Sequence, residues 1–373
     1  MQLRALSEFL KNVMNDTVAV TSSIADILVT GKDRSLSQQE RTKLTHGYIW
    51  YDFASVPQCL NELKNDEQTQ QAQMDAILSI PAYVKACSFF IVLCPTVVHA
   101  TTGGICDFRS WQERGWCRAE GISWLLVKDQ SEVLLLSSPT EAHFASHFIS
   151  ALQHPVGQGE FAVADDRKVL YQVVEALFDR SLQKRSITSE RDPTGLLLKC
   201  IRHTILAGLP PPTPTASPQC TSGIPSQDEQ EAFLSDFGFT SWNHRRAHGW
   251  TPLMCAAAAD NLGMVRAAVR AGLPVQQKTR AGVPLLAVPS GLSALHMACS
   301  WSSEATVQAL LDGNADPNQL GSTVGITAMV AAAAREDADP RALGVVQTLI
   351  KNGANVVEGQ GFLGLTPLHC AVA

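Results

Sequence analysis

The chain has 373 residues, of which 45% are hydrophobic and 17% are charged, and its formal net charge is −6. This length allows two or three domains, and the composition excludes a globally disordered chain. The acidic balance lacks the positive charge that nucleic-acid binding requires, so no nucleic-acid partner is expected.

No targeting segment or membrane span is apparent in the sequence. Residues 1–10 carry Arg4 and Glu8 within a helical pattern, unlike a signal peptide. The longest apolar run, residues 88–94, is far shorter than the roughly 18 residues that a spanning helix needs. The ten cysteines are scattered among apolar segments, which is typical of reduced thiols. We therefore expect a cytoplasmic protein, with the nucleus as an open alternative.

The first half of the chain alternates predicted helices with short predicted strands. Some segments repeat apolar residues at helical spacing, and others are short continuous apolar runs. Expected helices cover residues 1–14, 75–86, 116–124, 161–182 and 194–206, and expected strands cover residues 27–29, 48–53, 88–94 and 132–136. Because strands that alternate with helices usually pair in parallel, we predict an α/β domain with a mainly parallel sheet.

A proline-rich stretch separates this half from the rest of the chain. Six prolines lie between Leu209 and Ser226, among Ser, Thr and Gly residues. Proline fixes φ and removes a backbone donor, so the stretch is expected to be an extended linker. The sequence thus predicts an α/β domain over residues 1–206, a linker over residues 207–230 and a repeat region over residues 231–373.

The repeat region contains four similar segments. They begin at Gly249, Gly291, Gly325 and Gly364, at spacings of 42, 34 and 39 residues, and read GWTPLMCA, GLSALHMA, GITAMVAA and GLTPLHCA. They resemble the ankyrin repeat, whose unit of about 33 residues carries a Thr-Pro-Leu-His box. The resemblance extends from Asn243 to the end of the chain. It implies an all-α solenoid of about three repeats and a truncated fourth.

The residue chemistry of these segments agrees with paired helices. Thr251 and Thr366 are suited to cap helices that begin with proline, whose missing N–H is not needed at a helix start. Gly272, Gly313 and Gly353 fall where the second helix of each pair is expected to end. Glycine readily takes the left-handed conformation that such ends favour.

The ankyrin resemblance implies binding of a protein partner on a concave face. Exposed turn residues are the candidates for that contact: Asp316, Asn318 and Asn355. The usual histidine of the motif, here His296 and His369, is expected to bond to the turns between repeats rather than to act in catalysis. No cofactor is expected for such a stack.

The first half also resembles a known class of domains. Residues 115–120 read GWCRAE and follow a predicted strand and helix in the order seen in Toll/interleukin-1 receptor (TIR)-type domains, whose third helix often opens with Trp-Cys-x-x-Glu. Residues 50–58, WYDFASVPQ, are similar to a segment of fungal heterokaryon-incompatibility (HET) domains. The similarity covers about residues 1–136. The strand that opens a TIR domain has no counterpart before the first helix.

In catalytic TIR domains the glutamate of this box supports cleavage of the nicotinamide–ribose bond of NAD, so the resemblance gives that role to Glu120. A carboxylate can stabilise the oxocarbenium-like state of such a cleavage. Asp52 and Ser55 are then expected beside Glu120 at the strand ends, with Arg118 on phosphate and Trp116 stacked on a ring. The alternative is structural, with Trp116 in the core and Glu120 favoured by the helix dipole.

Two functions therefore stay open. The first is protein–protein interaction through the repeats, with the N-terminal domain as a signalling or assembly module that self-associates. The alternative is an NAD-cleaving enzyme that the repeats target, with NAD as substrate. No metal site is expected, because no C-x-x-C pair occurs. The cluster of Arg245 and Arg246 with His244 and His248 is expected to be solvated.

Overall fold

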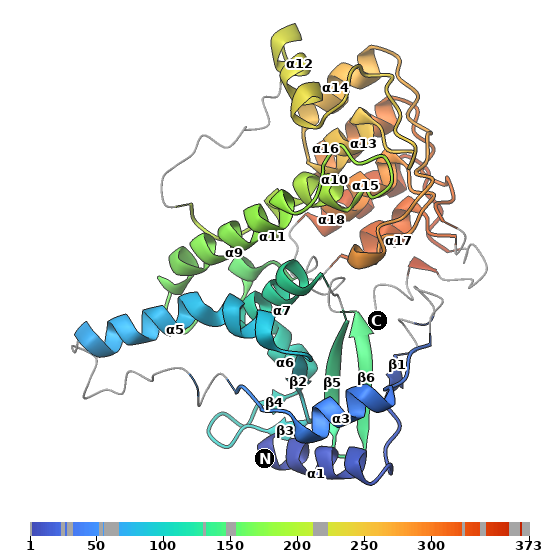
Figure 1. Cartoon of the computed structure of the whole chain (residues 1–373). Coiled ribbons are helices and arrows are strands. Elements are labelled where there is room, and N and C mark those ends of the chain that lie inside the picture. The colour runs from blue at the N-terminus through green and yellow to red at the C-terminus, as the bar shows by residue number, and fades with distance from the viewer. Residues whose placement is uncertain are drawn as a thin grey trace. The chain divides into compact units, whose positions relative to one another are not determined.

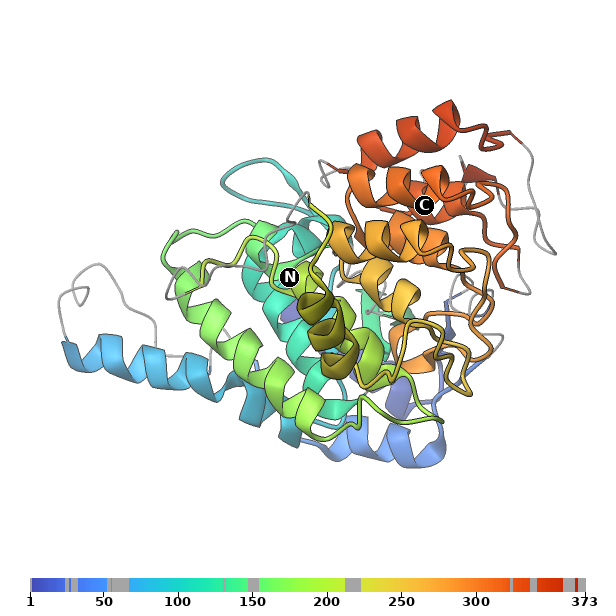
Figure 2. The ribbon, with the colours of Figure 1, turned by 90° about the horizontal axis from the view of Figure 1, so that it is seen from above.

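A computed structural model describes residues 2–23, 27, 33–51, 55, 67–129, 132–146, 154–211, 223–322, 325–335, 341–357 and 366–367, shown in Figures 1 and 2. These residues form two compact units. The first contains Met1–Leu177 and Gly208–Pro210, and the second contains Phe178–Ala207 and Pro211–Ala373. In the part of the chain that the structure describes, no helix is both long enough and apolar enough to cross a membrane.

The first unit is built around a small mixed sheet. Its strands lie in the order β1 (Thr21–Ser22), β6 (Glu141–Ser146), β5 (Glu132–Ser138) and β2 (Ile91–Leu93). The outer pairs β1–β6 and β2–β5 are parallel, whereas the central pair β5–β6 is antiparallel. Two of the three pairs are thus parallel, as expected, but the sheet is mixed, because a two-residue turn joins β5 to β6 and such a turn reverses the chain.

Helices and a hairpin accompany this sheet in the first unit (Figure 1). They are α1 (Gln2–Met14), α3 (Gln38–His46), α5 (Glu67–Ala86), α6 (Phe108–Glu113), α7 (Gly115–Lys128), the short η2 (Val156–Gln158), the first part of α9 (Asp166–Gln183), and the hairpin of β3 (Val97–Val98) and β4 (Ile105–Cys106). The expected helices at residues 1–14 and 116–124 and the expected strand at residues 132–136 are confirmed by α1, α7 and β5.

Strand β5 carries the core on both of its faces. Leu134 and Leu136 pack in one cluster with Phe9 of α1, whereas Val133 and Leu135 pack in another with Trp124 of α7. Side chains alternate across a strand, so four consecutive apolar residues indicate a strand that is covered on both sides. Helices α1 and α7 therefore bury opposite faces of the sheet.

The expected strand at residues 48–53 is not present over its described part. Residues 48–51 are irregular, and Tyr48 is fully exposed. Trp50 instead stacks on Tyr83 of α5, with ring centroids 5.3 Å apart. Trp50 therefore packs against a helix. A single sequence does not distinguish an aromatic residue in such a contact from one in a buried strand. Residues 52, 53, 28 and 29 lie outside the described residues, and Ile27 is helical.

The second unit consists of stacked helices. Three helix pairs follow one another: α13 (Pro252–Ala258) with α14 (Leu262–Arg270), α15 (Ala294–Trp301) with α16 (Glu304–Asp312), and α17 (Ala328–Ala333) with α18 (Ala342–Lys351). The first helices pack in the order α13, α15 and α17, and the second helices in the order α14, α16 and α18 (Figure 2). We call these the inner and the outer helices.

The expected caps explain where these helices begin and end. The Thr251 hydroxyl accepts a hydrogen bond from the Met254 N–H at 3.3 Å, and Pro252 follows it in the first turn of α13. Gly272 and Gly353 have positive φ after α14 and α18, as expected for left-handed helix ends. After α16 the left-handed residue is Asn314 rather than Gly313.

The stack continues towards the N-terminus beyond the three pairs. Helix α10 (Thr194–Cys200) packs against α13 as a further inner helix, followed by the short α11 (Arg202–Ile205). Helix α12 (Gln227–Asp236) comes after the proline-rich segment. The helices before and after that segment thus lie in the second unit, although Gly208–Pro210 belong to the first. The main boundary between the units falls inside α9, between Leu177 and Phe178. This division differs from the expected boundaries at residues 206 and 230.

Candidate protein-binding surface

The turns between repeats form a connected edge, which we call the turn edge. It comprises the loops at residues 239–250, 273–292 and 315–322, which follow α12, α14 and α16 respectively. Side chains of one loop donate to backbone carbonyls of the next: Arg245 to Lys278 (2.7 Å), Gln276 to Asn314 (2.9 Å), Lys278 to Leu320 (2.6 Å) and Asn318 to Gly353 (2.9 Å). These bonds fix successive loops relative to one another.

The three predicted partner-binding residues come together at one end of this edge. The Asn318 carboxamide donates to the Gly353 carbonyl and accepts from the Asn355 backbone N–H at 2.7 Å. The Asp316 carboxylate accepts from the Asn318 backbone N–H at 2.9 Å and is exposed. Asn318 therefore holds two loops together, which a sequence alone does not reveal, while Asp316 stays accessible at the surface.

His296 has the local role that the motif implies. Its ring is buried, with Nδ1 2.8 Å from the Ser293 hydroxyl and Nε2 3.1 Å from the Ile326 carbonyl of the following loop. Burial lowers the pKa of this imidazole to about 4. The neutral ring therefore links α15 to the next turn, and the expectation of local bonding is confirmed. His369 lies outside the described residues.

The predicted solvated cluster at residues 244–248 is instead partly a buried core. The Arg246 guanidinium is buried, donates to the carbonyls of Ile187, Phe237 and Gly238, and lies 4.6 Å above the Phe239 ring. This corrects the sequence interpretation, because three carbonyls and an aromatic face replace water around the two terminal nitrogens, while the buried Nε has no hydrogen-bond partner among the described residues. Burial lowers the pKa of this guanidinium.

A carboxylate links the first helix pair to the second. Asp260, in the turn between α13 and α14, accepts hydrogen bonds from the Ser303 backbone N–H (2.9 Å), the Ser303 hydroxyl (2.7 Å) and the Thr306 hydroxyl (2.6 Å). These donors stand at the start of α16. A carboxylate at a helix N-terminus is favoured by the helix dipole and satisfies otherwise unpaired backbone donors.

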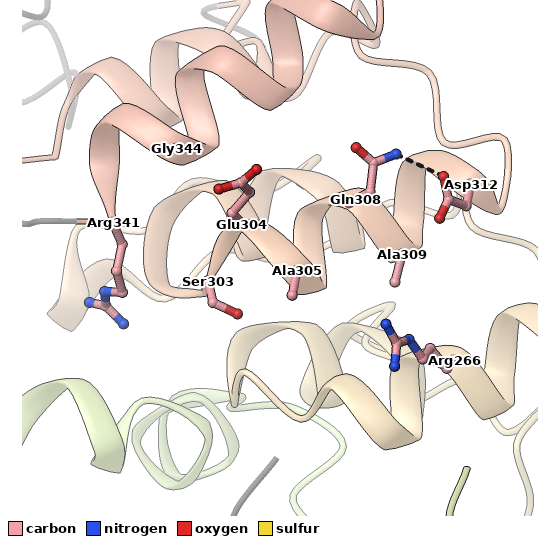
Figure 3. Close-up of a pocket in the computed structure, with 9 residues that line it drawn as sticks. All are labelled: Arg266, Ser303, Glu304, Ala305, Gln308, Ala309, Asp312, Arg341 and Gly344. Atoms are coloured by element: carbon pink, nitrogen blue, oxygen red, sulfur yellow. Dashed lines mark hydrogen bonds between the residues drawn. The ribbon is translucent and has the colours of Figure 1, made fainter. Parts of the chain in front are cut away.

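A shallow groove of 630 Å³ runs over the outer helices α14, α16 and α18 (Figure 3). Ala305 and Ala309 contribute small side chains and Gly344 only its backbone, and Arg341 and Arg266 lie towards the two ends of the groove. Its carboxylates are already engaged: Glu304 accepts from Thr348 at 3.0 Å, and Asp312 accepts from Gln308 at 2.7 Å. Over the described ranges, no group of three His, Cys, Asp or Glu side chains is placed to hold a metal ion.

The residues predicted for NAD chemistry lie on and around α7. Arg118 is buried and donates to the carbonyls of Gln112 (2.5 Å) and Pro155 (3.0 Å). The Trp116 indole donates to the Asp166 carboxylate at 2.8 Å. Both side chains thus connect α7 to neighbouring segments of the first unit.

Two of the three remaining members of that predicted site lie among the described residues. Glu120 is half-buried on α7, whereas Ser55 is exposed. Asp52 lies outside the described residues. The geometry therefore contributes no further support for a catalytic constellation beyond the motif itself.

Comparison with known proteins identifies the repeats. A family model described as ankyrin repeats (3 copies) matches residues 231–321. These residues are ankyrin repeats. The match begins within α12 and includes the pairs α13–α14 and α15–α16. No curated protein matches the chain. Ankyrin repeats typically bind other proteins, which suggests protein–protein interaction as the role of the second unit.

Proposed function

We propose that this protein is a cytoplasmic adaptor that binds a protein partner through the concave face of its ankyrin repeats, with the turn edge at its rim. The hydrogen bonds that join successive loops carry this proposal. Arg245, Gln276, Lys278 and Asn318 hold the loops in register before a partner arrives. A surface that is already ordered loses less conformational entropy on binding.

Charged side chains also reach solvent from this edge. Arg280 and Asp316 are exposed, and they lie in two successive loops. Their opposite charges favour a partner surface with charges of both signs rather than a uniformly charged polymer. The proposed partner is therefore a folded or extended protein segment of mixed charge.

Photo-cross-linking from defined positions tests this proposal. A photoreactive residue replaces Arg280 or Asp316 on the turn edge, and Arg270 at the exposed end of α14 serves as the matched control. After irradiation in cells, mass spectrometry identifies the cross-linked protein. We expect the same partner from positions 280 and 316 and little from position 270. Equal recovery from position 270 contradicts a partner on the turn edge.

For the first unit we propose an assembly or signalling role that includes self-association. The observation behind this choice is that Arg118 and Trp116 use their polar atoms inside the unit. Those side chains are then not displayed for phosphate or ring binding. NAD cleavage with Glu120 is the alternative, and it rests on the TIR-like motif.

Nicotinamide release from NAD separates these roles. The purified chain and its Glu120→Ala variant are assayed side by side, with Glu113→Ala on the exposed end of α6 as the control. The assembly role predicts no turnover above background in any sample. Turnover that Glu120→Ala abolishes and Glu113→Ala preserves would replace it with the enzymatic one.

A further inference from the structure

A fourth loop of the second unit is placed like the three loops of the turn edge. It comprises residues 186–192, which lie between α9 and α10. This loop precedes α10 as the loop at residues 239–250 precedes α13. Helices α10 and α13 pack against each other as successive inner helices. Because neighbouring units of a stack contact each other in sequence, loop 186–192 occupies the position of the next turn.

Polar contacts join this fourth loop to the turn edge. The buried Arg246 guanidinium donates a hydrogen bond to the Ile187 carbonyl. The Nε2 atom of His248, which is also buried, lies 3.1 Å from the Ser189 carbonyl. Both side chains belong to loop 239–250 of the turn edge. The two loops are therefore linked by side-chain to carbonyl contacts, as the other neighbouring loops of the edge are.

A carboxylate makes a third link and remains at the surface. Glu190 accepts a hydrogen bond from the Ala247 backbone N–H at 2.6 Å, and the residue is exposed. Within the loop, the Ser189 hydroxyl accepts from the backbone N–H groups of Arg191 (3.3 Å) and Asp192 (3.0 Å). Contacts inside the second unit thus hold the loop in one conformation, which lowers the entropy lost when a partner binds.

The four loops carry charge in an ordered pattern. Loop 186–192 has two carboxylates and one cation, and all three of these residues are exposed. The next two loops, at residues 239–250 and 273–292, each have two cations and no carboxylate. The last loop, at residues 315–322, has one carboxylate and no cation. The extended edge is therefore acidic at both ends and basic in its middle.

We infer that the partner-binding surface extends to loop 186–192 and takes an extended protein segment that is acidic in its middle and basic at both ends. The inference rests on the proposed binding at the turn edge. Complementary charges orient a partner and select against one with the opposite order of charge. Packed helices lie about 8–10 Å apart and an extended chain advances about 3.3 Å per residue, so four loops match about ten residues of the partner.

Photo-cross-linking from position 191 tests how far the surface extends. A photoreactive residue replaces Arg191 in the full chain, since this side chain is exposed on the fourth loop. The same replacement of Arg280 on the turn edge is the positive control, and that of Arg270 on α14 is the negative one. We expect the same partner from positions 191 and 280, and little from position 270.

The variant Glu190→Gln tests the charge pattern. Glutamine keeps an acceptor for the Ala247 N–H and removes the negative charge. The control Glu231→Gln removes an equal charge from an exposed position on α12, outside the four loops. Fluorescence anisotropy with the cross-linked segment of the partner should show a dissociation constant raised about threefold by Glu190→Gln, as expected for one exposed charge pair, and unchanged by Glu231→Gln. Circular dichroism verifies that both variants are folded.

The outcomes separate this inference from the proposed function. Cross-linking from position 191 together with weaker binding of Glu190→Gln supports the inference. A partner captured from position 280 but not from position 191 overturns it and leaves the proposed function in place, and so does an unchanged affinity of Glu190→Gln. Capture from neither position contradicts the proposed function itself, and the inference with it.

Discussion

At the residue scale, the buried imidazole of His296 connects structure to pH. Its pKa is lowered to about 4 by burial, whereas an unfolded histidine titrates near 6.5. Between these values the unfolded chain binds a proton that the folded chain excludes. The contribution of His296 to the free energy of unfolding is therefore fully present above about pH 6.5 and is lost as the pH falls towards 4. Burial also lowers the pKa of His203 and His248, which act in the same direction.

We predict that His296→Gln makes stability less dependent on pH. The native chain should lose about 2 kcal/mol from this one group between pH 7 and pH 5, and the variant should not lose that part. Urea unfolding at both pH values measures the difference, with His46→Gln at an exposed site as the control. Equal pH slopes in the native chain and His296→Gln would contradict the account.

The residue type predicts the local hydrogen bonding correctly where a repeat motif defines the position. The position of His296 within its repeat predicted a bond to the next turn, and the structure has it. Arg246 was misread as solvated, because its burial depends on Phe239 and on carbonyls up to 59 residues away in sequence. A single sequence does not show such long-range partners.

At the element scale, Asp260 determines how firmly the first helix pair is joined to the second. We predict that Asp260→Ala lowers the free energy of unfolding by about 2–4 kcal/mol, because it removes a charged acceptor from three donors. Asp260→Asn should lower the free energy of unfolding by less, since asparagine keeps an acceptor and tolerates the positive φ at this site. Urea midpoints of the two variants check this order, and equal losses would refute it.

The elements that could be predicted are those with strong local signals. The Thr-Pro starts of the repeats, the amphipathic α1 and the apolar strand β5 were all recognisable. Strand β6 was missed, although Ala142 and Phe144 alternate with less buried residues. The strand expected at residues 48–51 is not present. These residues have the aromatic composition of a strand, but Trp50 packs on helix α5.

At the scale of the whole molecule, the boundary between the units is the main difference from the sequence interpretation. Prolines at residues 210–225 indicate an extended segment, and they do not show which helices lie together. Leu196, Leu197 and Leu198 of α10 are buried in the structure, and α10 packs against α13. The stack thus begins before the proline-rich segment.

This division predicts the behaviour of two fragments. Residues 178–373 should unfold cooperatively, whereas residues 223–373, which lack α10, should be less stable by several kcal/mol, because each buried leucine contributes about 1.5–3 kcal/mol. Urea denaturation followed by circular dichroism measures both. Equal stability of the two fragments would contradict a structural role for α10 in the stack.

The central claim is that recognition lies at the ankyrin turn edge. Hydrogen–deuterium exchange of the full chain, with and without the partner found by cross-linking, tests it most directly. The account predicts slower exchange on binding in the loops at residues 239–250, 273–292 and 315–322, and unchanged exchange in α1 and α5. Protection confined to the first unit, or to the outer helices α14 and α16, would contradict the account.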